Sequence, residues 1–88
     1  MVRRQVIVHG RVQGVFFRDT IRRQAVERGL AGSAANRPDG TVEAVFEGAA
    51  EDVDALVELC RQGPPRAEVE RVELFEQEPE GIEGFRIR

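Results

Sequence analysis

The stretch "HGRVQGVFFRDT", His9 to Thr20, decides the fold of this 88-residue chain, because it joins a strand pattern to a helix pattern. It holds two glycines, two arginines and two adjacent phenylalanines. Immediately before it, Val2–Val8 ends in three β-branched residues, which is typical of a buried central strand. The stretch is therefore a connector between a strand and a helix, and it is unusually rich in residues that could form a binding site.

The residues after the connector indicate a helix. Phe17, Ile21 and Ala25 fall four residues apart, which places them on one face. This spacing predicts a helix over Arg18–Arg28. Gly29 ends it, because glycine readily adopts the left-handed conformation that closes a helix.

A β-hairpin is predicted next. Ala31–Asn36 is a weak strand by propensity, and Arg37–Gly40, "RPDG", has the composition of a tight turn. The run Thr41–Gly48 then alternates in polarity, as a strand with one buried face does. The residues expected on that buried face are Val42, Ala44 and Phe46.

A second helix and a further strand complete the pattern. Helical spacing places four apolar residues on one face: Val53, Leu56, Val57 and Cys60. Gly63–Pro65 stops this helix, and Ala67–Gln77 follows as a strand. Its apolar phase slips between Val69 and Val72, which predicts a bulge or bend. The tail Gly84–Arg88 alternates again and predicts a short last strand.

The element order β-α-β-β-α-β predicts an α+β, ferredoxin-like split β-α-β sandwich. We expect one domain, residues 1–88, with two helices on one face of an antiparallel sheet of four main strands plus a short C-terminal strand. In this layout the first two strands run in the same direction. The connector and the end of the second strand, Asn36, should therefore meet at one edge of the molecule.

Composition excludes several classes of site. The chain has one cysteine, one histidine and no lysine, which excludes an internal disulfide, a thiolate or histidine metal cluster and Schiff-base chemistry. Its net charge of −3 argues against a nucleic-acid partner. No apolar run approaches the roughly 20 residues needed to span a membrane. We expect a cytoplasmic monomer without nucleic-acid or membrane partners.

The connector has the ingredients of an anion site. Gly10 and Gly14 allow the backbone to curl with its N–H groups inward, and a helix N-terminus follows directly. Arg18 stands at that junction, and its planar guanidinium matches two phosphate or carboxylate oxygens. The same glycines would also make an ordinary strand-to-helix turn with Arg18 in solvent. Residue chemistry alone leaves both interpretations open.

The neighbours of this cradle are interpreted more plainly. Phe16 and Phe17 are expected in the core, one anchoring the loop and the other starting the helix face. Gln13 is interpreted as a polar loop residue, and Arg11 as a solvated charge. Asn36 has an amide suited to hold both a water and a ligand, although capping its own turn is the simpler role.

Two segments resemble the acylphosphatase family. "VHGRVQGVFFR", Val8–Arg18, is similar to the first signature of that family. "GSAANRPDGTVEAVFEG", Gly32–Gly48, is similar to the second, with Asn36 and Asp39–Val42 in register. Length and element order also fit, so the resemblance covers nearly the whole chain.

The resemblance implies an enzyme that hydrolyses acyl phosphates to a carboxylate and inorganic phosphate, without metal or cofactor. Arg18 would be the catalytic, phosphate-binding side chain, and Asn36 would hold the attacking water. The implied partners are a small acyl phosphate and inorganic phosphate or another anion as product or inhibitor. The phosphate-binding residues that the resemblance implies are consecutive: Arg11, Val12, Gln13, Gly14, Val15, Phe16, Phe17 and Arg18.

One residue departs from the family pattern: Ser33 stands where an aromatic residue usually follows the glycine. If that aromatic packs the core, we expect lower stability but surviving catalysis. Thr41 is interpreted as a strand residue rather than a support for Asn36. His9 is expected to be structural rather than a general base, and Cys60 to be core rather than a nucleophile. Solvated strand faces are expected for five carboxylates: Glu43, Glu47, Glu68, Glu70 and Glu73.

Two other functions fit the same element order. A non-catalytic module would bind small molecules or regulate partners, as ferredoxin-like domains often do. An acylphosphatase-like domain also begins the large hydrogenase-maturation carbamoyltransferases, but those continue with cysteine-rich segments that are absent here. An RNA-recognition domain would need exposed aromatic residues on its central strands, and here only Phe46 is a candidate. A binder would tolerate loss of Asn36 but not of Arg18, whereas an enzyme would need both.

Overall fold

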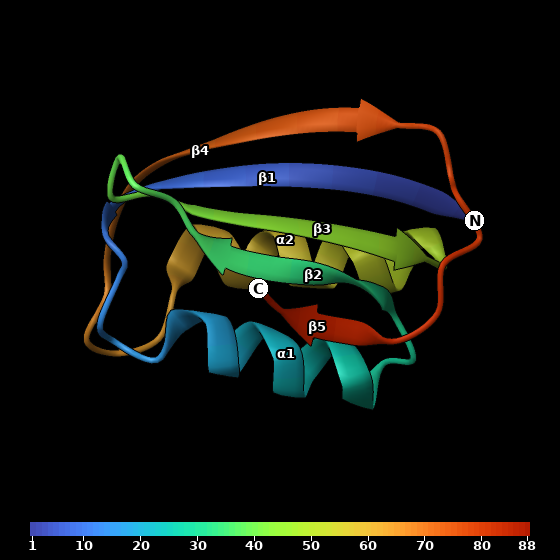
Figure 1. Ribbon diagram of the computed structural model, residues 1–88, viewed down its shortest axis with the longest axis horizontal. Coiled ribbons are helices and arrows are strands. Elements are labelled where there is room, and N and C mark those ends of the chain that lie inside the picture. Colours follow the sequence, from blue (N-terminus) through green and yellow to red (C-terminus); the bar gives the residue numbers. More distant parts are fainter.

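The computed structural model describes residues 1–88, and Figure 1 shows a curved sheet with two helices on one of its faces. The elements follow the predicted order, and both predicted helices lie within a residue or two of their expected bounds. In chain order they are β1 (Val2–Arg11), α1 (Phe17–Glu27), β2 (Ala31–Asn36), β3 (Val42–Gly48), α2 (Ala50–Gln62), β4 (Glu68–Gln77) and β5 (Phe85–Ile87). Neither helix is long and apolar enough to cross a membrane.

The sheet order is β4-β1-β3-β2-β5. The four main strands pair in antiparallel fashion, as expected. The short tail strand β5, whose direction the sequence did not predict, pairs in parallel with β2 and so makes the sheet mixed. Since β1 and β2 both pair with β3, they run in the same direction, and their ends meet at the same edge.

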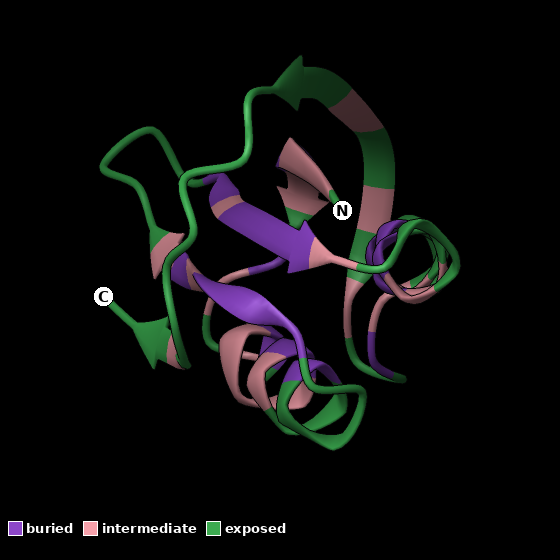
Figure 2. Cartoon of the chain, turned by 90° about the vertical axis from the view of Figure 1, so that its right-hand side faces the viewer, coloured by how far each residue is buried: buried purple, intermediate pink, exposed green.

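The core lies between the sheet and the two helices, and Figure 2 shows buried residues on the facing sides of both layers. The helix faces predicted from spacing are buried on both helices. Val42, Ala44 and Phe46 are fully buried on β3, as their alternation predicted. Phe85 of β5 stacks on Phe46 with ring centroids 5.8 Å apart, which holds the tail strand on the core.

The predicted bulge is present in β4. The register with β1 shifts between His9 and Gly10, which pair with Arg71 and Val69 and leave Glu70 as the extra residue. A Cβ on Gly10 would lie 2.0 Å from the main-chain oxygen of Glu68, so only glycine fits there. Gly10 thus belongs to β1 and allows β4 to approach closely at the bulge. The sequence had suggested instead that Gly10 curls the loop after β1.

Glu47 is the exception among the carboxylates expected to be solvated. It is 2% exposed, because the segment between β4 and β5 crosses over it. Its carboxylate accepts hydrogen bonds from the main-chain N–H groups of Glu80 and Gly81, both at 2.8 Å, and from Arg3 Nη1 at 3.2 Å. The Glu80 hydrogen bond is the main reason why the pKa of Glu47 lies below its usual value.

Candidate active site

The loop between β1 and α1 curls with its N–H groups unused. Gly14 has a φ of 74° and Phe16 a φ of 60°, both in the left-handed region. No N–H group from Gln13 to Phe16 donates to a main-chain or side-chain acceptor. No side chain caps the start of α1, so its first-turn N–H groups add free donors and the positive end of the helix dipole. The loop therefore has the donor arrangement of an anion nest.

Two buried residues fix this loop from its ends. Val12 is 1% exposed and Phe17 is 2% exposed, and both belong to the main apolar cluster. Phe16 was expected in the core, and that expectation is wrong, because the residue is 74% exposed. The reason is the left-handed backbone at Phe16, which turns its side chain outward while Phe17 turns inward at the first position of α1.

Gln13 connects the loop to the turn after β2. Its Nε2 donates to the main-chain oxygens of Arg37 at 2.7 Å and Thr41 at 3.0 Å. The turn is itself rigid, since Asp39 Oδ1 accepts from the Thr41 hydroxyl at 2.6 Å and from the Thr41 N–H at 3.0 Å. These bonds, the hydroxyl first, hold the pKa of Asp39 below its usual value. Gln13 thus holds the loop between β1 and α1 in place against the turn that follows β2.

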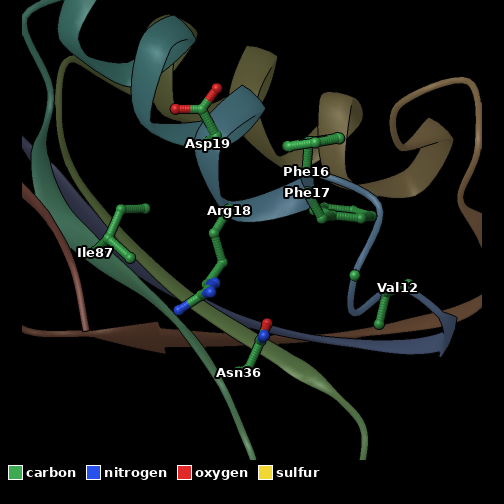
Figure 3. A pocket seen from close by; sticks show the side chains of 8 residues that line it. Val12, Phe16, Phe17, Arg18, Asp19, Asn36 and Ile87 are labelled. Atoms are coloured by element: carbon green, nitrogen blue, oxygen red, sulfur yellow. The ribbon is translucent and has the colours of Figure 1, made fainter.

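Arg18 and Asn36 line the same cleft, of about 300 Å³. Figure 3 shows Arg18 reaching from the start of α1 toward Asn36 at the end of β2, as the strand directions predicted. Arg18 Nη1 donates to the main-chain oxygen of Arg88 at 3.1 Å, which steadies the guanidinium from the β5 side. The residues that line the cleft are Val12, Gly14, Phe16, Phe17, Arg18, Asp19, Asn36 and Ile87.

The charges around the cleft favour an anion. Asp19 also lines the cleft, but it pairs with Arg22 at 3.4 Å and Arg23 at 3.2 Å, and it forms no ion pair with Arg18. No aspartate or glutamate side chain therefore forms an ion pair with Arg18. A guanidinium, unused N–H groups and a helix N-terminus around one hollow can hold a phosphate-sized anion.

Known proteins are similar to this chain over nearly its whole length. A family model for acylphosphatase matches residues 4–87. An acylphosphatase from Rubrobacter xylanophilus is 56% identical, with 96% of this chain and 77% of that protein covered. One from Haloarcula marismortui is 50% identical, covering 98% and 94%. The crystal structure of acylphosphatase from Bacillus subtilis superposes with a TM-score of 0.95 at 38% identity, covering 100% of this chain and 99% of that one.

The chain belongs to the acylphosphatase family. Membership confirms the expectation of an enzyme that hydrolyses acyl phosphates, and the likeness in structure confirms the ferredoxin-like α+β fold. The chain also matches 12% of full-length HypF, with a TM-score of 0.90 at 27% identity. The acylphosphatase relatives are instead matched over most of their own length.

Three residues that were considered for other catalytic or supporting roles lie outside the cleft. His9 Nε2 lies 2.6 Å from Glu73 Oε1, on the sheet face opposite the helices, which fits a structural role. Cys60 is completely buried, and burial raises the pKa of its thiol to about 12, so it is core. The Thr41 hydroxyl is bonded to Asp39 and gives no support to Asn36.

Ser33, Arg11 and Ile87 are the remaining residues whose positions bear on the predicted site. Ser33 lies on β2 opposite Val45 and beside Arg86, on the sheet face away from the helices. Its replacement of an aromatic residue therefore leaves the helix-side core intact. Arg11 is exposed, as expected, and its Nη2 donates to the main-chain oxygen of Arg66 at 3.0 Å. Ile87 also lines the cleft, which the sequence did not predict, although the alternating tail pattern places Ile87 on the same strand face as Phe85.

Proposed function

We propose that the loop from Arg11 to Arg18 binds the phosphoryl group of an acyl phosphate. The unused N–H groups from Gln13 to Phe16 and the first turn of α1 face the phosphoryl oxygens, and the Arg18 guanidinium holds two of them. Arg11 stands at the edge of this set, since its side chain is bound to Arg66. Fixed donors of this kind stabilise the charge that gathers on phosphoryl oxygens in the transition state.

Asn36 positions the attacking water in this proposal. Its side-chain carbonyl accepts a hydrogen bond from the water and its NH₂ group donates to a phosphoryl oxygen. The water oxygen forms a bond to phosphorus while the bond from phosphorus to the acyl oxygen breaks, which releases a carboxylate. The proton of the water passes to a phosphoryl oxygen, so no protein base is needed. The substrate is already activated, and position and charge supply the catalysis.

The observation that carries this proposal is that Arg18 and Asn36, from separate elements, line one cleft. The test is phosphate release from benzoyl phosphate with a chelator present. Turnover that persists in the chelator and disappears in Arg18→Ala would support the proposal. Arg61→Ala is the matched control, because Arg61 is an exposed arginine in the last turn of α2. Equal loss in both variants would contradict a specific role for Arg18.

We further propose that the protein is a monomer in the cytoplasm. It acts on a small acyl phosphate and needs no metal, cofactor, nucleic acid or membrane. The net charge of −3 argues against a nucleic-acid partner, and the charged outer faces of the helices favour a monomer. Light scattering of the purified chain at several concentrations checks the monomer. A mass that rises with concentration would contradict it.

A further inference from the structure

Phe16 adopts a conformation that is unfavourable for its residue type. It is a bulky aromatic residue with a φ of 60° and a ψ of 27°, and the residue is 74% exposed. A left-handed conformation at a residue other than glycine costs about 1–3 kcal/mol and clusters at functional sites. Because the ring is exposed, it does not contribute the hydrophobic free energy of folding that a buried phenylalanine would contribute. Packing of the fold therefore gives no reason for a phenylalanine at this position.

The ring stands between two hollows. One is the cleft that contains Arg18 and Asn36, and the other is a groove of about 440 Å³ on the outer side of the loop. Phe16 and Asp19 line both, so the groove continues directly from the cleft. In Figure 3 the Phe16 ring lies on the side of the loop away from Asn36. The residues that line the groove are Val15, Phe16, Asp19, Thr20, Arg23, Pro64, Pro65 and Arg66.

The groove is lined by both carbon-rich and charged residues. Phe16, Val15 and the two prolines supply the carbon surface. Arg23 is paired with Asp19, whereas the Arg66 side chain forms no ion pair. A small-molecule site typically has this make-up, with hydrophobic and aromatic walls and few polar groups. The rigid Pro64–Pro65 wall loses little entropy when it orders a ligand.

The geometry of an acyl phosphate connects the two hollows. The acyl carbon is joined to phosphorus through one bridging oxygen, so the acyl group begins where the phosphoryl group ends. With the phosphoryl group in the cradle, an acyl group that leaves the cleft past Phe16 enters the groove. An aromatic or branched apolar acyl group would cover the exposed ring, whereas an acetyl group is too short to do so.

We propose that Phe16 and the groove between the first turn of α1 and Pro64–Arg66 form the acyl-group subsite, which selects apolar and especially aromatic acyl phosphates over acetyl phosphate. This inference rests on the proposed function, in which the phosphoryl group occupies the cradle. Phe16 then has two separate tasks. Its N–H group belongs to the phosphate loop, and its ring contacts the acyl group.

The test compares kcat/KM for benzoyl phosphate and for acetyl phosphate, and the measured quantity is their ratio. Phe16→Gly removes the ring, keeps the N–H group and relieves the positive φ, so it should fold at least as well as the wild type. We expect the benzoyl-to-acetyl ratio to fall roughly fivefold to thirtyfold. Thr20→Trp fills the groove from α1 and should lower the same ratio. Phe16→Leu keeps an apolar side chain and should retain part of the preference.

Val26→Ala is the matched control, because Val26 is another exposed apolar residue of α1, away from both hollows. It should leave the ratio unchanged. An unchanged ratio in both Phe16→Gly and Thr20→Trp, with both substrates still hydrolysed, would overturn the acyl subsite alone. Failure of the wild type to hydrolyse either substrate would overturn the proposed function, and the subsite with it.

Discussion

The side-chain nitrogen of Gln13 lies 2.7 Å from the main-chain oxygen of Arg37, and this hydrogen bond joins the phosphate loop to the end of β2. Arg37 directly follows Asn36, so the bond fixes the distance between the two halves of the proposed site. A second bond, to the main-chain oxygen of Thr41 at 3.0 Å, prevents rotation about the first. Gln13 therefore acts as a positioning residue between the phosphate loop and the amide that holds the water.

Gln13→Ala should lower kcat more than it weakens phosphate binding. The loop keeps its N–H groups and Arg18, but Asn36 is no longer held in register with them. Loss of two hydrogen bonds worth about 1 kcal/mol each lowers kcat by roughly fivefold to thirtyfold. Steady-state kinetics with inorganic phosphate as a competitive inhibitor measure both effects. A loss that appears only in the inhibition constant would show that Gln13 binds phosphate instead.

Phe17→Ala should destabilise the fold, in contrast to changes at the adjacent Phe16. Phe17 is 2% exposed within the main apolar cluster, and truncation of a buried phenylalanine costs about 3–5 kcal/mol. Urea unfolding followed by circular dichroism measures the free energy of unfolding of each variant. Phe16→Gly serves as the paired comparison and should lose none of it. Equal destabilisation by both variants would contradict the opposite burial of these two neighbours.

Glu47→Gln should change how stability depends on pH. The pKa of Glu47 is lowered from 4.5 in the folded state, chiefly by the Glu80 N–H bond, so its carboxylate contributes stability above pH 4.5. That contribution is lost as the pH falls through the folded-state pKa. The free energies of unfolding of wild type and variant should therefore differ at pH 7 and converge as the pH falls below 4.5. A difference that stays constant over this range would contradict the assignment.

Local patterns predicted most of the fold. Helical spacing located the buried faces of α1 and α2, and polarity alternation located that of β3, because these depend only on residues a few positions apart. The slip between Val69 and Val72 correctly predicted the bulge at Glu70. The Arg18–Asn36 cleft also followed from strand directions, since β1 and β2 must end at the same edge.

The errors concern contacts set by distant parts of the chain. Glu47 looks like any outward strand residue, and its burial depends on the segment after β4, which has no regular pattern. The tail alternation at Phe85 and Ile87 predicted a strand but carried no sign of its parallel pairing with β2. Phe16 was placed in the core because apolarity is visible in sequence, whereas its left-handed backbone is not.

The most direct test of the proposed site separates phosphate binding from turnover. Arg18→Ala and Asn36→Ala are each measured for benzoyl phosphate hydrolysis and, by calorimetry, for binding of inorganic phosphate, with Gln24→Ala as the control for an exposed amide. Loss of one fixed donor raises the barrier by about 2.7–4 kcal/mol, so both variants should lose turnover by roughly 10²–10³-fold.

Phosphate affinity should fall strongly in Arg18→Ala and little in Asn36→Ala, because only the guanidinium carries charge to the anion. Gln24→Ala should match the wild type in both measurements. Equal loss of phosphate affinity in Arg18→Ala and Asn36→Ala would contradict the division of roles, and full turnover in either would remove that residue from the site.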